Sequence, residues 1–238
     1  MSNYQLSLAL SLPDDATFAN FTAGYNQPVY DAIMGLAQGD KADDFVYLCG
    51  AYGSGRSHLL QAACHARHEA NRTAIYIPLG QGEFGVDIFD GLENISLVCI
   101  DDIDSVLGNA RWDEALFHFY NRAQQSRVQL LVSAKQLPSQ LEHCLPDLRS
   151  RLCWGLVFQL SPLSDAQKLT AVRHRARLRG FSISDEVASV LLRHFPRDTH
   201  ALFALLDALD QKSLQEQRLI TIPFVKSVIS EGRAAGWL

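Results

Sequence analysis

The feature that most constrains the fold is a glycine-rich run, G-A-Y-G-S-G-R-S, at residues 50–57. Its spacing is that of a phosphate-binding loop, G-x-x-x-x-G-K-[ST], with arginine where lysine is usual. An apolar run at 45–49 precedes it and an amphipathic stretch follows from Ser57, so the pattern predicts a strand, a loop and a helix in succession. Glycines let the backbone curl until its amides surround an anion, and the helix adds the positive end of its dipole. The residues expected to bind phosphate are Gly50, Tyr52, Gly53, Ser54, Gly55, Arg56, Ser57 and His58.

Two side chains of this loop have distinct expected roles. Arg56 supplies a cation that can neutralise phosphate, and Ser57 supplies a hydroxyl that can ligate Mg²⁺. A guanidinium is a planar fork and differs from the point charge of an ammonium, so we expect a diphosphate to bind while hydrolysis in this chain's own site is weak. The alternative interpretation is a glycine-rich turn that holds no ligand.

A second candidate site lies at the end of the apolar run 95–100, which is followed by Asp101 and Asp102. A continuous apolar strand that ends in carboxylates suits a buried parallel strand whose working end lies at the edge of the sheet. In ATPases with a phosphate-binding loop, such a strand provides a carboxylate that holds Mg²⁺. We expect Asp101 to hold the ion through water, opposite Ser57, and Asp102 to occupy the place of a catalytic glutamate. The alternative is a solvated strand end whose carboxylates cap the next segment.

Composition argues against several classes of protein. The net charge of −5 argues against a free-standing DNA-binding surface, because duplex affinity comes largely from basic residues that neutralise phosphates. The five cysteines show no C-x-x-C spacing, which favours a reduced, cytoplasmic protein without zinc or structural disulfides. The sequence contains no signal-peptide pattern and no apolar run near the roughly 20 residues of a membrane span.

The order of predicted elements divides the chain into three parts. Five strands alternate with helices up to the run Ser161-Pro162-Leu163, and four helical patterns follow it. This order is typical of a three-layer α/β domain with a parallel sheet, followed by a small all-helical lid. We expect an extended tail at 1–15, the α/β domain at 16–162 and the lid at 163–238. The five strands are expected at 45–49, 73–78, 95–100, 129–133 and 154–160.

The tail alternates apolar and small polar residues over 5–12. One interpretation is an edge strand or a loose terminal segment. The other is a short linear motif that docks into a partner's groove, with Gln5 as a hydrogen-bonding hook and Leu6, Leu8 and Leu10 as apolar anchors.

Residues 18–235 together resemble the AAA+ ATPase module of DnaA, the bacterial replication initiator. The resemblance rests on the loop at 50–57, the L-V-C-I-D-D run at 97–102, Ser133, and the D-L-R-S-R-L-C-W-G run at 147–155. It implies a P-loop AAA+ sheet domain with a helical lid. It also implies that Ser133 is a nucleotide sensor and that the arginine at position 151 is an arginine finger.

Several positions depart from the family pattern. Arg56 replaces the usual lysine, and Lys135 stands where DnaA has an aspartate. His200 stands at the position of the family's second sensor arginine, in the third lid helix, and Arg197 lies about one turn earlier. By resemblance, these changes favour a stable ADP-bound state over sensing of the γ-phosphate.

The smaller regulatory homologues of DnaA, which lack its C-terminal helix-turn-helix domain, resemble this chain most. Their tail carries a sliding-clamp-binding motif, Q-L-x-L-x-L, that residues 5–10 fit. This resemblance implies a protein that binds ADP, or ATP, with Mg²⁺, and that offers Arg151 in trans to ATP held by DnaA. The implied partners are DnaA and the DNA polymerase III sliding clamp, and DNA is contacted only indirectly, through the clamp. No membrane partner is implied, and a homo-oligomer is possible. Two other readings stay open: a DnaC-like helicase loader that hydrolyses its own ATP, and a plain interaction module with a relict nucleotide site.

Overall fold

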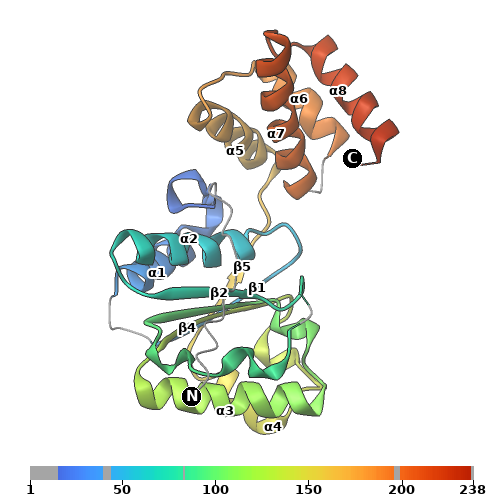
Figure 1. Ribbon diagram of the computed structural model, residues 1–238. Helices are drawn as coiled ribbons and strands as arrows, with labels where there is room; N and C mark the ends of the chain where they lie inside the picture. The colour runs from blue at the N-terminus through green and yellow to red at the C-terminus, as the bar shows by residue number, and fades with distance from the viewer. Residues whose placement is uncertain (1–15, 40–43, 83, 196–198, 237–238) are drawn as a thin grey trace, which may run out of the picture. The chain divides into compact units, whose positions relative to one another are not determined.

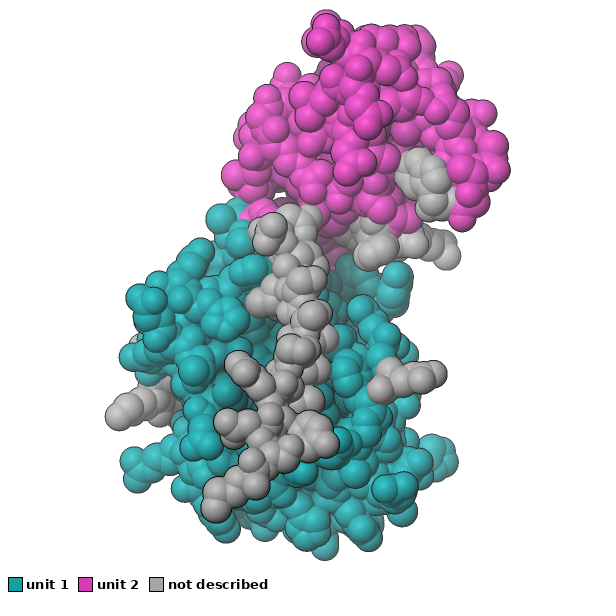
Figure 2. Space-filling model, viewed as in Figure 1, with its two compact units in different colours: residues 1–19, 27–160 teal, residues 20–26, 161–238 magenta. Residues whose placement is uncertain are grey.

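The computed structural model describes residues 16–39, 44–82, 84–195 and 199–236. The chain forms two compact units, coloured separately in Figure 2. The first contains Gln27–Leu160 and the described residues before Asn20. The second contains Asn20–Asn26 and the described chain from Ser161 onward.

The first unit is built on a parallel sheet of five strands in the order β2-β3-β4-β1-β5. Consecutive strands are therefore not always neighbours: β4 lies between β3 and β1, so the ends of these three strands meet at one edge of the sheet. The neighbouring strands β1 and β4 are buried along their whole length, as expected for strands covered on both faces of the sheet. The strands are β1 Phe45–Gly50, β2 Ala74–Pro78, β3 Leu97–Asp101, β4 Gln129–Ala134 and β5 Leu156–Leu160.

Helices cover both faces of this sheet, which gives the three layers visible in Figure 1. The helices α1 (Gln27–Gln38) and α2 (Arg56–Glu69) lie together on one face, and α3 (Ala110–Ser126) and α4 (Pro146–Leu152) lie on the other. Short 3-10 turns lie at Phe18–Asn20, Gly24–Asn26, Val86–Phe89, Leu92–Asn94, Ile103–Ser105 and Pro138–Gln140.

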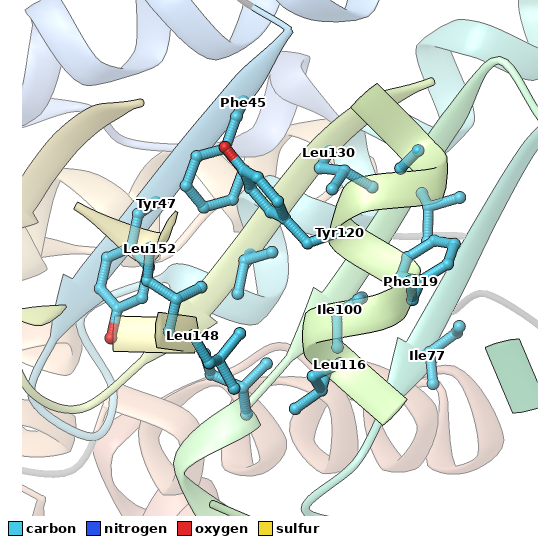
Figure 3. Close-up of a cluster of buried hydrophobic side chains, with 14 of the residues drawn as sticks. Phe45, Tyr47, Ile77, Ile100, Leu116, Phe119, Tyr120, Leu130, Leu148 and Leu152 are labelled. Carbon is cyan, nitrogen blue, oxygen red and sulfur yellow. The ribbon is translucent and has the colours of Figure 1, made fainter. Parts of the chain in front are cut away.

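The core between the sheet and α3 and α4 is shown in Figure 3. Phe119 and Tyr120 of α3 pack onto strand residues, and the ring of Tyr120 meets the ring of Phe45 edge to face at 5.2 Å. Leu148 and Leu152 fix α4 to the same core, and both are almost fully buried. Burying an aliphatic side chain of this kind stabilises the fold by about 1.5–3 kcal/mol. The short helix α4 is therefore held firmly at the edge of the sheet.

The second unit is a small helical bundle around its own apolar core. A capping box opens its first helix, since the Ser164 Oγ accepts from the Gln167 main-chain amide and the Gln167 Oε1 accepts from the Ser164 main-chain amide. Leucines of the longest helix, such as Leu202, Leu205 and Leu206, are fully buried in the centre. The helices are α5 Asp165–Leu178, α6 Asp185–His194, α7 Thr199–Glu216 and α8 Ile222–Ala235.

The segment Asn20–Asn26 groups with the helical unit, although the sequence places it inside the α/β domain. The Asn26 side chain is buried and forms two hydrogen bonds with the main chain of Ser161, 2.9 Å to its carbonyl oxygen and 2.8 Å from its amide. An added Cβ at Gly24 would lie 2.6 Å from the side-chain Nε2 of Gln167, so this turn lies against the Gln167 side chain at the start of α5. These contacts join residues that are far apart in sequence, which periodicity cannot reveal.

The predicted fold class is confirmed: a parallel α/β sheet domain is followed by a four-helix unit. The tail at 1–15 and the start of the third lid pattern at 197–198 lie outside the described residues. Within the described ranges, no helix combines the length and apolar character needed to cross a bilayer.

Candidate functional site

The glycine-rich loop lies between the end of β1 at Gly50 and the start of α2 at Arg56. Gly53 and Gly55 have φ angles of 74° and 99°, in the left-handed region that favours glycine. An added Cβ at Gly50 would lie 2.6 Å from the Ser54 Oγ, so the loop closes too tightly for a larger residue there. The chain thus forms the curled turn before a helix N-terminus that suits an anion.

The cation of this loop points inward and is buried. The Arg56 Nη1 lies 2.8 Å from the Asp102 Oδ1, with 6% of the arginine side chain and 26% of the aspartate side chain exposed. Their geometry is that of an ion pair without a hydrogen bond, because both of these atoms, and the Ser54 Oγ, are buried without a hydrogen-bond partner. Buried polar groups usually have partners. The Ser54 Oγ and Arg56 Nη1 groups, which make no hydrogen bond here, could therefore donate to the oxygens of a phosphate group.

Asp101, at the end of β3, accepts two hydrogen bonds and is almost fully buried. The Tyr76 hydroxyl of β2 donates to its Oδ2 at 2.7 Å, and the Ser133 hydroxyl of β4 donates to its Oδ1. Ser133 also accepts a hydrogen bond from the Asp102 amide at 3.1 Å. The predicted sensor Ser133 and the predicted Mg²⁺ carboxylate therefore lie in direct contact.

Tyr76 is a site residue that the sequence reasoning missed. Burial and then the negative charge of Asp101 raise the pKa of its hydroxyl, while hydrogen bonds with Gln61 and Ser57 act in the opposite direction. The hydroxyl therefore stays protonated and links the serine of the loop to the carboxylate of β3. A tyrosine in a strand is usually a core residue. The available signal was its place near the carboxyl end of β2, two residues before Pro78, which pairs with Asp101 in the sheet register.

Asp102 follows β3 in a left-handed conformation, with φ of 53°. Burial raises the pKa of its carboxyl above the usual value, the neighbouring charge of Asp101 raises it further, and Arg56 opposes both. Asp104 and Lys135 form a separate ion pair one turn further on. The aspartate predicted in the place of a catalytic glutamate is thus engaged with the cation of the loop.

The remaining predicted residues lie in different surroundings. Tyr52 is exposed at the tip of the loop. The ring of His58 contacts the main chain, since its Nε2 lies 2.8 Å from the Thr17 carbonyl oxygen. This nitrogen is therefore engaged in a contact other than the predicted one with phosphate. His200 lies in α7 and its side chain is outside the described part of the structure. Arg197 and the four tail residues Gln5, Leu6, Leu8 and Leu10 also lie outside the described residues.

Arg151 lies in the last turn of α4, away from the loop. Its guanidinium carbon is 4.1 Å from the centroid of the Trp154 ring, and Trp154 is 67% exposed. Gly155, the next residue, packs against Phe45 at the start of β1, whereas the phosphate-binding loop follows the end of β1. The two candidate sites therefore lie at opposite ends of the same strand.

A parallel sheet with helices on both faces, a phosphate-binding loop after β1 and a carboxylate at the end of β3 define a P-loop module of the AAA+ class. The sequence profile of the bacterial DnaA ATPase domain matches residues 12–159, and that of the Hda lid domain matches residues 165–229. The chain therefore belongs to the bacterial DnaA ATPase family, as an Hda-like homologue of DnaA. The resemblance predicted from the sequence is confirmed.

Solved structures share this fold across nearly the whole chain. Domain III of the Thermotoga maritima initiator DnaA is 20% identical, with a TM-score of 0.78 over 93% of this chain and 98% of that one. AMPPCP-bound DnaA from Aquifex aeolicus is 19% identical, with a TM-score of 0.71 over 86% of this chain and 68% of that one. The Aeropyrum pernix ORC1 protein, in complex with DNA, is 16% identical, with a TM-score of 0.71 over 92% and 68% of the two chains.

Proposed function

We propose that this chain is a regulator of replication initiation that stimulates ATP hydrolysis by DnaA. It binds ADP with Mg²⁺ at the loop 50–57, docks on the DNA-loaded sliding clamp through residues 5–10, and offers Arg151 to ATP held by DnaA. The family profiles support the broad role, since a DnaA-type ATPase domain is joined to an Hda lid domain. The clamp contact rests on the sequence pattern of the tail alone.

The observation that carries the proposal is the place of Arg151. The strand β1 runs from Phe45, beside Gly155, to Gly50, where the loop begins. Phe45 and Gly50 are five residues apart in a strand that rises about 3.3 Å per residue, so they lie about 16 Å apart. This separation favours a role of Arg151 on a nucleotide held by another molecule. Among the described residues, none forms an ion pair with Arg151, so a structural ion pair does not account for it.

The chemistry of such an arginine is electrostatic. Charge develops on the equatorial oxygens of the transferred phosphoryl group, and a guanidinium delivered to them from a neighbouring molecule accelerates hydrolysis by about 10³–10⁵ in well-studied systems. The arginine needs only to reach the phosphate with its N–H donors free. It performs no covalent step itself.

The chain's own nucleotide site is suited to holding a diphosphate. The loop amides and Arg56 would bind the phosphates, Ser57 would ligate Mg²⁺, and Asp101 would hold the ion's water shell. A bound Mg²⁺ would neutralise part of the negative charge of the phosphates. Because Arg56 is engaged with Asp102, we expect weak hydrolysis of this chain's own ATP. AMPPCP in the Aquifex aeolicus relative supports nucleotide binding at the equivalent module.

The test measures hydrolysis of ATP by DnaA in the presence of clamp loaded on DNA. Wild type, Arg151→Ala and a chain lacking residues 1–10 are compared at equal concentration, and ADP affinity is measured for each. Arg149→Ala is the matched control, because it removes an arginine from the same helix two residues away.

We expect stimulation by the wild type and by Arg149→Ala, and its loss in Arg151→Ala and in the truncated chain, with ADP binding unchanged in all four. Full stimulation by Arg151→Ala would remove the finger assignment. No stimulation by the wild type would overturn the regulator reading as a whole. Helicase binding and intrinsic ATPase assays would then test the loader alternative.

A further inference from the structure

We propose that Trp154 is the positioning residue of Arg151. Its indole ring supports one face of the guanidinium, so that the N–H groups in the guanidinium plane stay free for the phosphate oxygens of a nucleotide held by a partner molecule. This inference rests on the proposed function, because it concerns the same arginine. It adds a second residue whose role in that reaction acts entirely through Arg151.

The contact itself is close and is supported by the main chain. The guanidinium carbon of Arg151 lies 4.1 Å from the centroid of the Trp154 ring, well within the roughly 6 Å limit of a cation–π interaction. The Trp154 amide donates to the Arg151 carbonyl oxygen at 3.0 Å, which fixes the spacing between the two residues. Tryptophan is the aromatic side chain that attracts a cation most strongly.

Stacking leaves the hydrogen-bonding capacity of the arginine intact. A guanidinium carries five N–H donors, all directed outward in its own plane, and a ring beneath it uses only the face. A carboxylate partner would instead occupy the in-plane donors and neutralise the charge. Trp154 can therefore hold the side chain in place without competing with phosphate.

A comparison with the other arginines that lie over aromatic rings sets Arg151 apart. Each of the other three in the described ranges also forms an ion pair with a carboxylate, whereas no described carboxylate pairs with Arg151. These pairs explain their positions as structural contacts of the fold. The three are Arg122 over Phe119 with Glu93, Arg175 over Phe203 with Asp207, and Arg218 over Phe224 with Glu216.

The position of Trp154 is fixed by its neighbours while its ring stays at the surface. Leu148 and Leu152 anchor α4 in the core. An added Cβ at Gly155 would lie 2.3 Å from the Phe45 carbonyl oxygen, so the chain leaves α4 in close contact with the first residue of β1. Trp154 nevertheless remains 67% exposed, whereas tryptophan is highly buried on average in folded proteins.

The first experiment tests the stacking without any partner. In the nitrogen-15 NMR spectrum of the ADP-bound protein, the Nε–Hε signal of Arg151 is expected upfield of the Arg149 signal, because it lies over the ring. Trp154→Ala should move the Arg151 signal to the Arg149 position, and Trp154→Phe should keep part of the shift. An Arg151 signal that does not respond to Trp154→Ala would overturn the contact.

The second experiment tests the consequence in the assay with DnaA and DNA-loaded clamp. Wild type, Trp154→Ala, Trp154→Phe, Leu156→Ala and Arg151→Ala are titrated to saturation, so that maximal rate and half-saturating concentration are separated. A cation–π contact that becomes desolvated has a free energy corresponding to about 2- to 30-fold in rate. We expect Trp154→Ala to lower the maximal rate by this factor, Trp154→Phe to recover part of it, and Leu156→Ala, an exposed apolar residue on the same edge, to leave it unchanged.

The outcomes separate this inference from the function on which it rests. Full stimulation by Arg151→Ala contradicts the finger assignment, which is the part of the proposed function on which this inference rests. Loss of stimulation in Arg151→Ala, with the wild-type maximal rate in Trp154→Ala, leaves the function standing and overturns the positioning role. A change only in half-saturating concentration for Trp154→Ala also overturns it, because Trp154 would then act as a docking contact.

Discussion

The guanidinium of Arg56 and the carboxylate of Asp102 form an ion pair, with Nη1 2.8 Å from Oδ1, that joins the phosphate-binding loop to the end of β3. The carboxylate thus lies beside the cation that we propose binds phosphate. Neither of these two atoms makes a hydrogen bond, so the ion pair leaves the hydrogen-bonding capacity of both atoms unused. A phosphate group that binds Arg56 through Nη1, as proposed, would therefore compete with this carboxylate.

This competition predicts that Asp102→Asn binds ADP more tightly in the absence of Mg²⁺. The change frees Arg56 and removes a negative charge from the vicinity of the diphosphate. We expect an increase of about 3- to 10-fold in affinity, since charges in a partly exposed site interact by roughly 1 kcal/mol. Isothermal titration calorimetry in EDTA provides the measurement. Asp104→Asn is the control, because Asp104 lies nearby and pairs with Lys135; equal or weaker binding by Asp102→Asn would argue against competition.

The local parts of this site could be predicted from the sequence. The strand before the loop, the loop and the helix after it are contiguous, so their spacing alone identifies them. The carboxylates after the third apolar run are equally local. The sequence did not reveal which side chains these groups contact: the Arg56–Asp102 pair joins the start of α2 to the end of β3, and the Tyr76–Asp101 hydrogen bond joins β2 to β3.

The sheet order explains why those contacts were hidden. Because β4 lies between β3 and β1, Ser133 meets Asp101 across more than thirty residues of chain, and no period in the sequence encodes that neighbourhood. The same holds for Asn26, which bonds Ser161 and draws its segment to the helical unit. Trp154 was visible within a motif, but its stacking on Arg151 depends on how α4 ends.

We predict that Tyr76→Phe weakens the response of nucleotide binding to Mg²⁺. The mutation removes the hydroxyl that donates to Asp101, which lets the carboxylate turn away from the serine of the loop. Loss of a supporting partner of this kind typically costs about 10- to 100-fold in metal affinity. Mg²⁺ titrations at fixed ADP, followed by calorimetry, measure the effect.

Tyr47→Phe is the matched control, since the Tyr47 hydroxyl donates to the Gln136 carbonyl oxygen and does not reach Asp101. Both changes remove a buried tyrosine hydroxyl, and each hydrogen bond lost is expected to lower the free energy of unfolding by about 0.5–1.5 kcal/mol. Only Tyr76→Phe should change the Mg²⁺ response. Equal Mg²⁺ responses in the two variants would show that the Tyr76 hydroxyl has no part in ion binding.

We predict that protonation of His58 lowers the free energy of unfolding in mild acid. Burial lowers the pKa of its ring below the ordinary value of about 6.5, opposed by the contact with Thr17 and assisted by His65. A group whose pKa is lower in the folded state contributes stability above the unfolded pKa, and this contribution is lost as pH falls below about 6.5. Urea unfolding of the α/β unit between pH 8 and pH 5.5 should show a steeper fall for wild type than for His58→Gln. Parallel curves would contradict the prediction.

Gly155→Ala is expected to destabilise the α/β unit and to weaken the presentation of Arg151. The added Cβ would lie 2.3 Å from the Phe45 carbonyl oxygen, and this backbone atom cannot move without distorting β1. Overpacking of this kind costs about 1–3 kcal/mol, so the urea midpoint should fall clearly. Gly85→Ala is the control, because the nearest atom there is the carboxylate oxygen of Asp87, which can rotate away. If both variants unfold at the same urea concentration, the close approach of Gly155 to β1 does not fix the end of α4, and the Trp154 ring is held by other contacts.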